Sequence, residues 1–424
     1  MLNFIKVIII VSLISGFLPV SVRAEELLTW GECINEAAKN HPDLIAAQEQ
    51  VKESEASKKI TASTLYPQVG SNLSASTGRN DTGTSNSTSD SYSYGVTGSQ
   101  LIFDGMQTIN NVKSASENIK AAKQNFKFTS ATVRYRLRSA FVSLLKTQEM
   151  LNITQEIYKI RRENLELVSL RYESGLENKG ALLTAEADLA DAQYQISQAK
   201  RQVEVAQRNL TKEMGRKQLV PMQVKGDFNV SDAAKVKPDF VSLSATNPSL
   251  QQIIAQKNAA EFGLKSSYGA FAPTLSGNAG ANKSDAHWAP KNDEWTMGLT
   301  LSLPIFEGGL RVAQVSGAKA LLNQLRENER STRDGIISTL EQAWATLQDA
   351  MENVGVQKEN LNATDVRSKI AQEQYSLGFI SFDNWTIIED NLVKAKRTYL
   401  DAEAAALLTE ANWIQAKGET LEYE

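Results

Sequence analysis

The sequence repeats itself once, at a spacing of about 200 residues. Segment 40–44 (NHPDL) returns 206 residues later as TNPSL, and segment 103–105 (FDG) returns 203 residues later as FEG. Tyr172 and Gly175 return as Tyr375 and Gly378. This period is too long for a solenoid unit, which has about 20–50 residues. It indicates a duplicated half-molecule, in which each structural element can be read twice.

Each half contains a long segment that predicts an unusually long helix. No proline occurs from Gly105 to Tyr172, and apolar residues recur every seventh position: Leu137, Leu144, Leu151, Tyr158, Leu165 and Tyr172. Their counterparts 203 residues later are Leu340, Leu347, Val354, Leu361, Ser368 and Tyr375. A heptad repeat sustained this long is typical of helices packed along a seam. At about 1.5 Å per residue, a helix over 104–172 spans roughly 100 Å.

Shorter helical patterns cover 31–64 and 179–215, and Pro42 predicts a break near His41. Their summed length is close to that of the long helix. We therefore expect two short helices to stack end to end beside each long one. Gly175 and Gly378 interrupt the pattern between each long helix and the helix that follows it.

Two short segments in each half predict strands. The clearest is 295–303, which alternates between an apolar face and a small polar face; the apolar residues are Trp295, Met297, Leu299, Leu301 and Leu303. Its expected partner is 274–281. In the first half we expect strands over 67–76 and from Tyr92 to Phe103, with the polar segment 77–91 as an exposed loop. Segment 277–284 (GNAGANKS) nearly matches a phosphate-binding loop, but it lacks the required glycine and the strand–loop–helix context.

Four strands per chain cannot close a membrane barrel, because small barrels begin at about eight strands. An open sheet with apolar residues and unpaired edges is prone to aggregate. A symmetric oligomer would close the sheet. Two copies would supply eight strands and three would supply twelve, and the residues alone do not decide between these numbers.

The first 24 residues predict a secretory signal peptide, with Lys6, an apolar run from Val7 to Leu18, and small residues before the cleavage site. A membrane anchor is the alternative, but the run is shorter than the roughly 20 residues that a spanning helix needs.

The formal net charge of −4 does not favour a nucleic-acid partner. We expect Cys33, the only cysteine, to be buried in a helix. The two histidines lie far apart in sequence, which argues against a histidine-based metal or catalytic site.

Several segments together resemble the TolC-like outer membrane efflux proteins, the outer membrane factors of tripartite efflux and type I secretion systems. Segment 28–48 resembles the opening of these proteins, and SQLIFDGMQTINNVKSA and LSLPIFEGGLRVAQVSGAKA resemble their two strand-to-helix junctions. RYESG (171–175) and QYSLG (374–378) are similar to their two helical-hairpin tips. The resemblance covers about 28–418, in the family's order and twice over.

The resemblance implies an α+β membrane protein that forms a homotrimer. Four strands per chain would make a twelve-stranded transmembrane β-barrel in the outer membrane of a Gram-negative bacterium, continuous with a periplasmic α-helical barrel. The tip would dock a periplasmic adaptor linked to an inner-membrane pump or ABC exporter, without a cofactor. The tip residues implied for docking and gating are Arg171, Tyr172, Gly175, Leu176, Tyr375, Gly378 and Phe379. The strand–helix junctions are Pro67, Phe103, Gly105, Pro273, Pro304, Phe306 and Gly308.

The tip departs from the family pattern in its charges. Ile380 stands where an arginine is expected, and Asn384 and Ile387 stand at acidic positions. A ring of carboxylates at the pore mouth is therefore not expected, nor is the cation selectivity that it would confer. The two tips differ in sequence, which predicts that one serves docking more and the other serves the gate more.

These patterns predict a signal peptide (1–24), a first repeat (25–215), a linker region (216–246), a second repeat (247–418) and a short tail (419–424). The predicted function is an export channel for small molecules or secreted polypeptides. The alternative is a structural or adhesive coiled-coil protein of the cell envelope. No constellation of residues supports a hydrolase or another enzyme, and the sequence does not identify the cargo.

Overall fold

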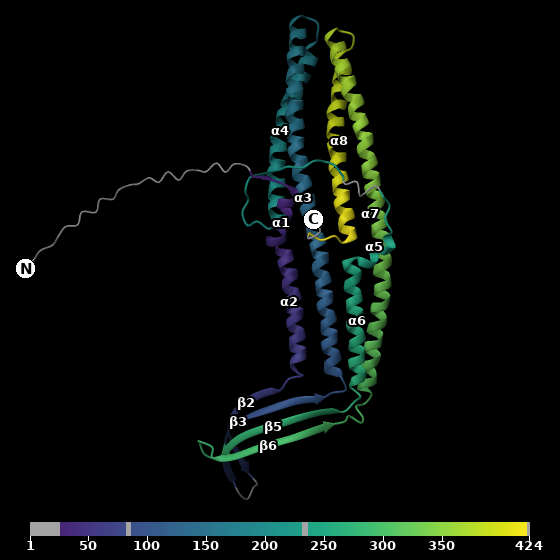
Figure 1. The fold of residues 1–424 in the computed structure, drawn as a ribbon. Helices are drawn as coiled ribbons and strands as arrows, with labels where there is room; N and C mark the ends of the chain where they lie inside the picture. Colours follow the sequence, from purple (N-terminus) through teal and green to yellow (C-terminus); the bar gives the residue numbers. More distant parts are fainter. Residues whose placement is uncertain (1–25, 82–85, 231–235, 422–424) are drawn as a thin grey trace, which may run out of the picture.

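The computed structural model describes residues 26–81, 86–230 and 236–421. Figure 1 shows a long, thin molecule with helical hairpin tips at one end and a β-sheet at the other. Two helices of 67 residues each, α3 (Gln107–Glu173) and α7 (Leu310–Ser376), run along most of it. This confirms the predicted long helices. The expected signal peptide lies outside the described residues.

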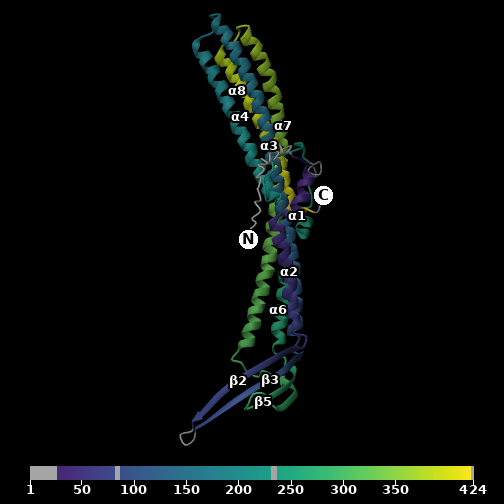
Figure 2. The ribbon, with the colours of Figure 1, turned by 90° about the vertical axis from the view of Figure 1, so that its left-hand side faces the viewer.

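Shorter helices flank both long ones. The helices α2 (Pro42–Ser63) and α4 (Lys179–Glu213) pack against different parts of α3, and α6 (Pro248–Gly269) and α8 (Phe382–Lys417) pack along α7. Both α6 and α8 also contact α3. The same arrangement is visible after a 90° turn in Figure 2. The expectation of two short helices in line beside each long one is therefore confirmed.

The joints between the stacked short helices require glycine. The helix α1 (Trp30–Asn40) ends just before α2, and the ring Nδ1 of His41 accepts a hydrogen bond of 3.1 Å from the backbone N–H of Asp43. Gly215, at φ +76°, lies so close to this break that a Cβ atom would be 2.4 Å from the carbonyl oxygen of Asn40. In the second half, a Cβ on Gly418 would be 2.4 Å from Pro248. No side chain fits at either position.

The sheet at the other end has four antiparallel strands in the order β2 (Gln68–Asp81), β3 (Asn86–Phe103), β5 (Thr274–Asp285) and β6 (Asn292–Ser302). The β2 and β6 strands are its edges. The predicted alternation holds on β6, where the apolar side chains project from the sheet with 66–80% of their surface exposed: Trp295, Met297, Leu299 and Leu301. Segment 277–284, which nearly matches a phosphate-binding loop, lies within β5.

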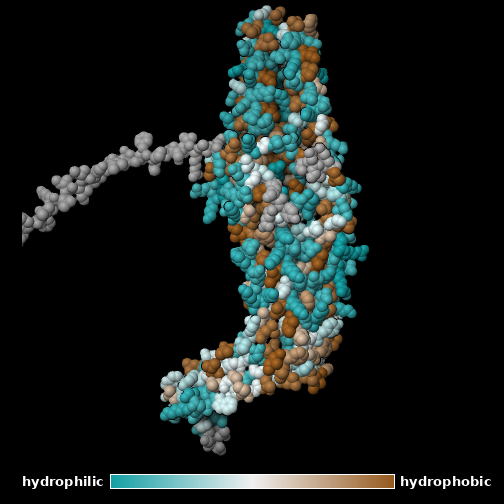
Figure 3. Space-filling model, in the orientation of Figure 1, coloured by the Kyte–Doolittle hydropathy of each residue, from teal (hydrophilic) through white to brown (hydrophobic). Residues whose placement is uncertain are grey.

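The prediction of a loop over 77–91 was wrong, apart from 82–85, which lie outside the described residues. Strands β2 and β3 stay paired as far as Asp81 opposite Asn86. Residues here are polar on both faces, so the alternation that marks a half-buried strand disappears while the backbone ladder continues. Thr77 also donates a hydrogen bond of 2.8 Å to Asp90 across the ladder. Figure 3 shows that this far end of the hairpin is hydrophilic.

The segment between the halves holds structure that the sequence did not predict. The strand β4 (Met222–Val224) pairs in parallel with β1 (Glu26–Leu28), and α5 (Phe240–Thr246) follows. Elements of three to seven residues are too short to show a periodic pattern. No helix among the described residues carries the long apolar stretch that crossing a membrane requires.

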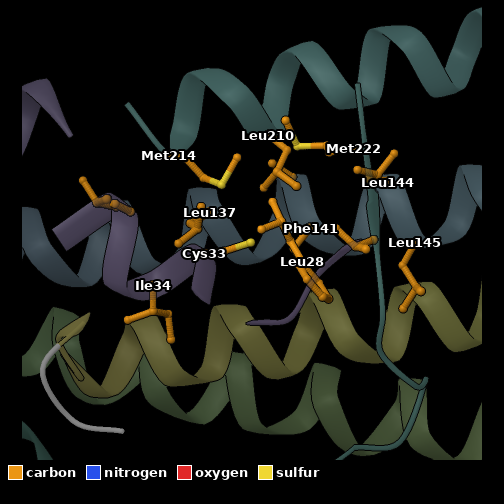
Figure 4. Packing of buried hydrophobic residues seen from close by; sticks show 14 of the residues in the cluster. Leu28, Cys33, Ile34, Leu137, Phe141, Leu144, Leu145, Leu210, Met214 and Met222 are labelled. Atoms are coloured by element: carbon orange, nitrogen blue, oxygen red, sulfur yellow. The ribbon is translucent and has the colours of Figure 1, made fainter. Parts of the chain in front are cut away.

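The largest hydrophobic cluster lies where α1, α3, α4 and β4 meet (Figure 4). Cys33 is fully buried there beside Leu137 and Phe141, as expected for a small side chain in a helix. Burial is the main cause that raises the pKa of Cys33 to about 12. Its thiol therefore stays protonated and serves as a packing group.

Candidate functional site at the helical tips

The two hairpin tips have the same backbone geometry. Gly175 and Gly378 adopt φ +73° and +79°, the left-handed conformation that favours glycine. The residue after each glycine closes the end of the helix with a backbone hydrogen bond of 2.8 Å. The N–H of Leu176 donates to the carbonyl oxygen of Arg171, and the N–H of Phe379 donates to that of Gln374. Asn178 and Ser381 then cap the returning helices. The tips are therefore tight turns that fix the positions of neighbouring side chains.

Tyr375 is the centre of an aromatic cluster at the second tip. Its side chain is fully buried, and its ring stacks on Trp385 with centroids 4.4 Å apart and an interplanar angle of 13°. Phe382 meets the same ring edge-on at 6.2 Å. These contacts join α7 to α8 just above the turn. Aromatic pairs of this kind add about 0.5–1.5 kcal/mol each beyond the area that they bury.

Two charged residues of the first tip hold Tyr375 from the other side. The Arg171 guanidinium lies 4.8 Å from the ring centroid, and its Nη1 donates to the carbonyl oxygens of Tyr375 and Ser376 at 3.2 and 3.3 Å. The Tyr375 hydroxyl donates a hydrogen bond of 2.9 Å to Glu177. Burial, followed by this bond to Glu177, raises the pKa of Tyr375. The cluster thereby joins the two hairpins of one chain.

The predicted tip residues divide into two groups. The structure brings Arg171 and Tyr375 into direct contact, between the glycine turns. Tyr172, the counterpart of Tyr375, is 37% exposed, and Leu176 and Phe379 are 67% and 76% exposed. The second group is therefore exposed at the tips of the single chain.

Sequence analysis missed Glu177, Phe382 and Trp385. Comparison of the repeats could have identified two of them, because Glu177 corresponds to Ile380 and Trp385 corresponds to Leu182. A charged or aromatic residue opposite an aliphatic one at the same offset marks a position where the two hairpins differ.

The three departures from the family pattern lie close to this cluster. Ile380 packs partly buried against it, whereas Asn384 is exposed and Ile387 is 59% exposed. The cation at this tip therefore comes from Arg171 of the first hairpin, and Ile380 contributes apolar packing in its place.

A second cluster joins the hairpins further along the helices. Arg161 of α3 pairs with Asp390 of α8 and lies 3.8 Å from Asp188 of α4. Glu389 is buried beside it and accepts a hydrogen bond from the Ser368 hydroxyl of α7. Burial is the main cause that raises the pKa of Glu389, and likewise that of Asp188. Three carboxyl groups thus surround one guanidinium between the two hairpins.

This arrangement predicts a pH dependence of the packing between the hairpins. The packed state binds a proton at Glu389 more readily than a separated, solvated state, where the pKa returns to about 4.5. The proton-linked stabilisation is therefore complete below pH 4.5 and is lost as the pH rises through the raised pKa.

Trypsin cleavage at the tips should accelerate over this range in the wild-type protein. In Glu389→Gln, the part of this pH dependence that comes from protonation of Glu389 should disappear. The control is Glu163→Gln, which alters an exposed carboxylate of α3. Equal pH profiles for the wild type and Glu389→Gln would contradict this account.

The predicted junction residues lie where the chain passes between helices and sheet. Pro67 and Pro273 precede β2 and β5, Phe103 ends β3, and Pro304 follows β6. Gly105 and Gly308 adopt φ +66° and +60° before the two long helices, and Phe306 is 87% exposed. A Cβ added to Gly105 would lie 2.3 Å from the carbonyl oxygen of Gly269, so the two glycines are in close contact. A Cβ added to Gly308 would have nothing within 4 Å.

Comparison with known proteins supports one family. The sequence matches the outer membrane efflux protein family over residues 33–216 and 241–419. It is 21% identical over 390 residues to the outer membrane efflux protein BepC of Brucella suis, covering 90% of this chain and 83% of BepC.

The fold is similar to solved outer membrane channels. CusC superposes with a TM-score of 0.81 at 20% identity, over 91% of both chains. The Campylobacter jejuni channel CmeC superposes with a TM-score of 0.81 at 17% identity, over 91% of this chain and 85% of CmeC. The family consists of outer membrane channels rather than enzymes. The chain described here belongs to the outer membrane efflux protein family.

Proposed function

We propose that three copies of this chain form an export duct, with a twelve-stranded barrel in the outer membrane and a helical tunnel through the periplasm. The open four-stranded sheet is the observation that carries this proposal. Within the described chain, each of the edge strands β2 and β6 is paired on one side only, and the apolar side chains of β6 are uncovered. Joining β6 of one copy to β2 of the next pairs both edges and turns the apolar face towards lipid.

The polar face of the sheet would line the lumen. Opposite Trp295, Met297 and Leu299, strand β6 carries Thr296, Gly298 and Thr300. Small uncharged residues leave a barrel interior open to water, instead of packing into a solid core. Transport through such a lumen is passive diffusion, and a partner protein must supply the energy.

The tips would form the gate and the docking surface. The cluster of Arg171, Glu177 and Tyr375 holds the two hairpins of one copy together. Leu176 and Phe379 remain exposed at the ends of the hairpins, where a periplasmic adaptor would dock and link the duct to an inner-membrane pump or ABC exporter. Contact with the adaptor would separate the tips and admit small molecules or secreted polypeptides.

The number of copies can be counted directly. Native mass spectrometry of the detergent-extracted protein should give three times the mass of the mature chain, and heating in denaturant should reduce this to one chain. A stable monomer would contradict the proposal, because one four-stranded sheet cannot close. A dimer would replace the twelve-stranded barrel by one of eight strands.

A further inference from the structure

The duplication allows the contact between two copies to be derived from the contact within one copy. Helices α3 and α7 are both 67 residues long, and positions 203 apart are equivalent from the start of each to the end of the returning helix. Within the chain, α3 packs against α8. In a tube of alternating equivalent hairpins, α7 of one copy must pack in the same way against α4 of the next. This argument rests on the proposed trimer.

The joint within one chain holds three ion pairs between α3 and α8. Arg161 pairs with Asp390, Glu156 lies 2.5 Å from Lys396, and Lys146 lies 2.7 Å from Asp401. At the equivalent positions, the joint between copies would place Thr364 opposite Ala187, Glu359 opposite Gln193, and Asp349 opposite Gln198. None of these pairs brings opposite charges together. The joint between copies therefore lacks all three ion pairs.

One other position gains a charge pair between copies. Within the chain, Asn164 of α3 and Glu389 of α8 line the same small pocket. Their equivalents are Arg367 on α7 and Glu186 on α4. Both are exposed in the single chain, and the structure shows no ion pair for either among the described residues. An arginine in place of asparagine has the length and the charge to reach a carboxylate across the joint.

The apolar residues of the two edge helices agree with this register. Ile370 of α7 is 53% exposed, whereas its equivalent Leu167 packs against the tip cluster. Leu183 of α4 is 52% exposed, whereas its equivalent Thr386 lines the pocket near Glu389. A second copy placed by the repeat would cover both side chains.

From these observations we infer that Glu186 of one copy pairs with Arg367 of the next. At the tips, too, the joint between copies differs from the joint within a chain. Arg171 and Glu177, which hold Tyr375 within the chain, are replaced by Gln374 and Ile380 at the positions that would face Tyr172 of the next copy. The charged contacts that secure the joint within a chain are thus absent at the equivalent positions between copies, where Glu186 and Arg367 are the equivalent pair of opposite charge.

Paired cysteines test this contact. In Glu186→Cys with Arg367→Cys, mild oxidation should convert most monomer on a denaturing gel into reducible covalent dimers and trimers. Cys33 is buried and out of reach. Glu156→Cys with Lys396→Cys, which replaces an in-chain ion pair, should cross-link without adding chains. Glu163→Cys with Arg367→Cys is the matched negative control, because Glu163 is exposed on α3, away from the inferred contact.

Charge reversal provides a second test. Glu186→Arg or Arg367→Glu alone should lower the fraction of trimer severalfold in a detergent dilution series, and the two together should restore it. If the wild-type protein is trimeric but the cysteines give no covalent oligomers and the double reversal restores nothing, the inferred pair is wrong while the proposed duct stands. If the wild-type protein is not trimeric, the duct itself is wrong.

Discussion

Replacing Tyr375 by alanine should open the tip of the protein. The substitution removes the ring that stacks on Trp385, the face beneath the Arg171 guanidinium and the hydroxyl bonded to Glu177. Truncation of a fully buried aromatic side chain costs about 3–5 kcal/mol. We expect trypsin to cleave after Arg171 and Lys179 much faster than in the wild-type protein, because both residues lie at the tip that Tyr375 holds in place.

Two variants separate the contributions at this site. Tyr375→Phe keeps the stack and loses only the hydroxyl bond to a charged group, which is worth about 1.5–3 kcal/mol, so its cleavage rate should be intermediate. Tyr172→Ala changes the equivalent residue of the first repeat, which is partly exposed, and should leave the rate nearly unchanged. Equal rates for Tyr375→Ala and Tyr172→Ala would show that the cluster does not hold the tip.

The substitution Gly105→Ala should destabilise the junction between sheet and helices far more than the same change in the second repeat. An added Cβ would lie 2.3 Å from the Gly269 carbonyl oxygen and 2.5 Å from the Cβ of Ala272, at φ +66°. The left-handed conformation costs about 1–2 kcal/mol, and the overlap adds about 1–3 kcal/mol or more. Thermal unfolding followed by circular dichroism should therefore show a markedly lower midpoint.

Gly308→Ala is the matched control for this prediction. Gly308 has nearly the same backbone angle, φ +60°, but nothing lies within 4 Å of the position that an added Cβ would take. The substitution should lower the free energy of unfolding only by the cost of the left-handed backbone conformation, about 1–2 kcal/mol. If the two variants unfold at the same temperature, the close contact between Gly105 and Gly269 does not contribute to stability.

The long-range architecture could be predicted from the sequence because it depends on regular repeats. The seven-residue apolar spacing from Leu137 to Tyr172 identified the long helix, and Pro42 identified the break before α2. The polar ends of β2 and β3 could not be predicted, because Ser and Thr on both faces leave no alternation and only backbone pairing reveals the strand. The elements β1, β4 and α5 are too short for any period to emerge.

The tip could be predicted only in part. Tyr375, Gly175 and Gly378 follow from the repeated motif, since the same spacing recurs in both halves. The contact of Arg171 with Tyr375 could not be predicted, because it depends on how two hairpins 204 residues apart lie against each other. Beside the apolar Ile380, the structure places a cation, Arg171, and a carboxylate, Glu177, from the first hairpin.

This outer membrane protein should form a water-filled duct through which cargo diffuses. Single-channel recording in a planar lipid bilayer would detect such a duct. The purified protein should give discrete, uniform conductance steps, and Tyr375→Ala should give larger or longer openings than the wild-type protein. Bilayers that remain silent, with correctly folded protein inserted, would contradict the duct and favour a structural or adhesive coiled-coil protein of the cell envelope.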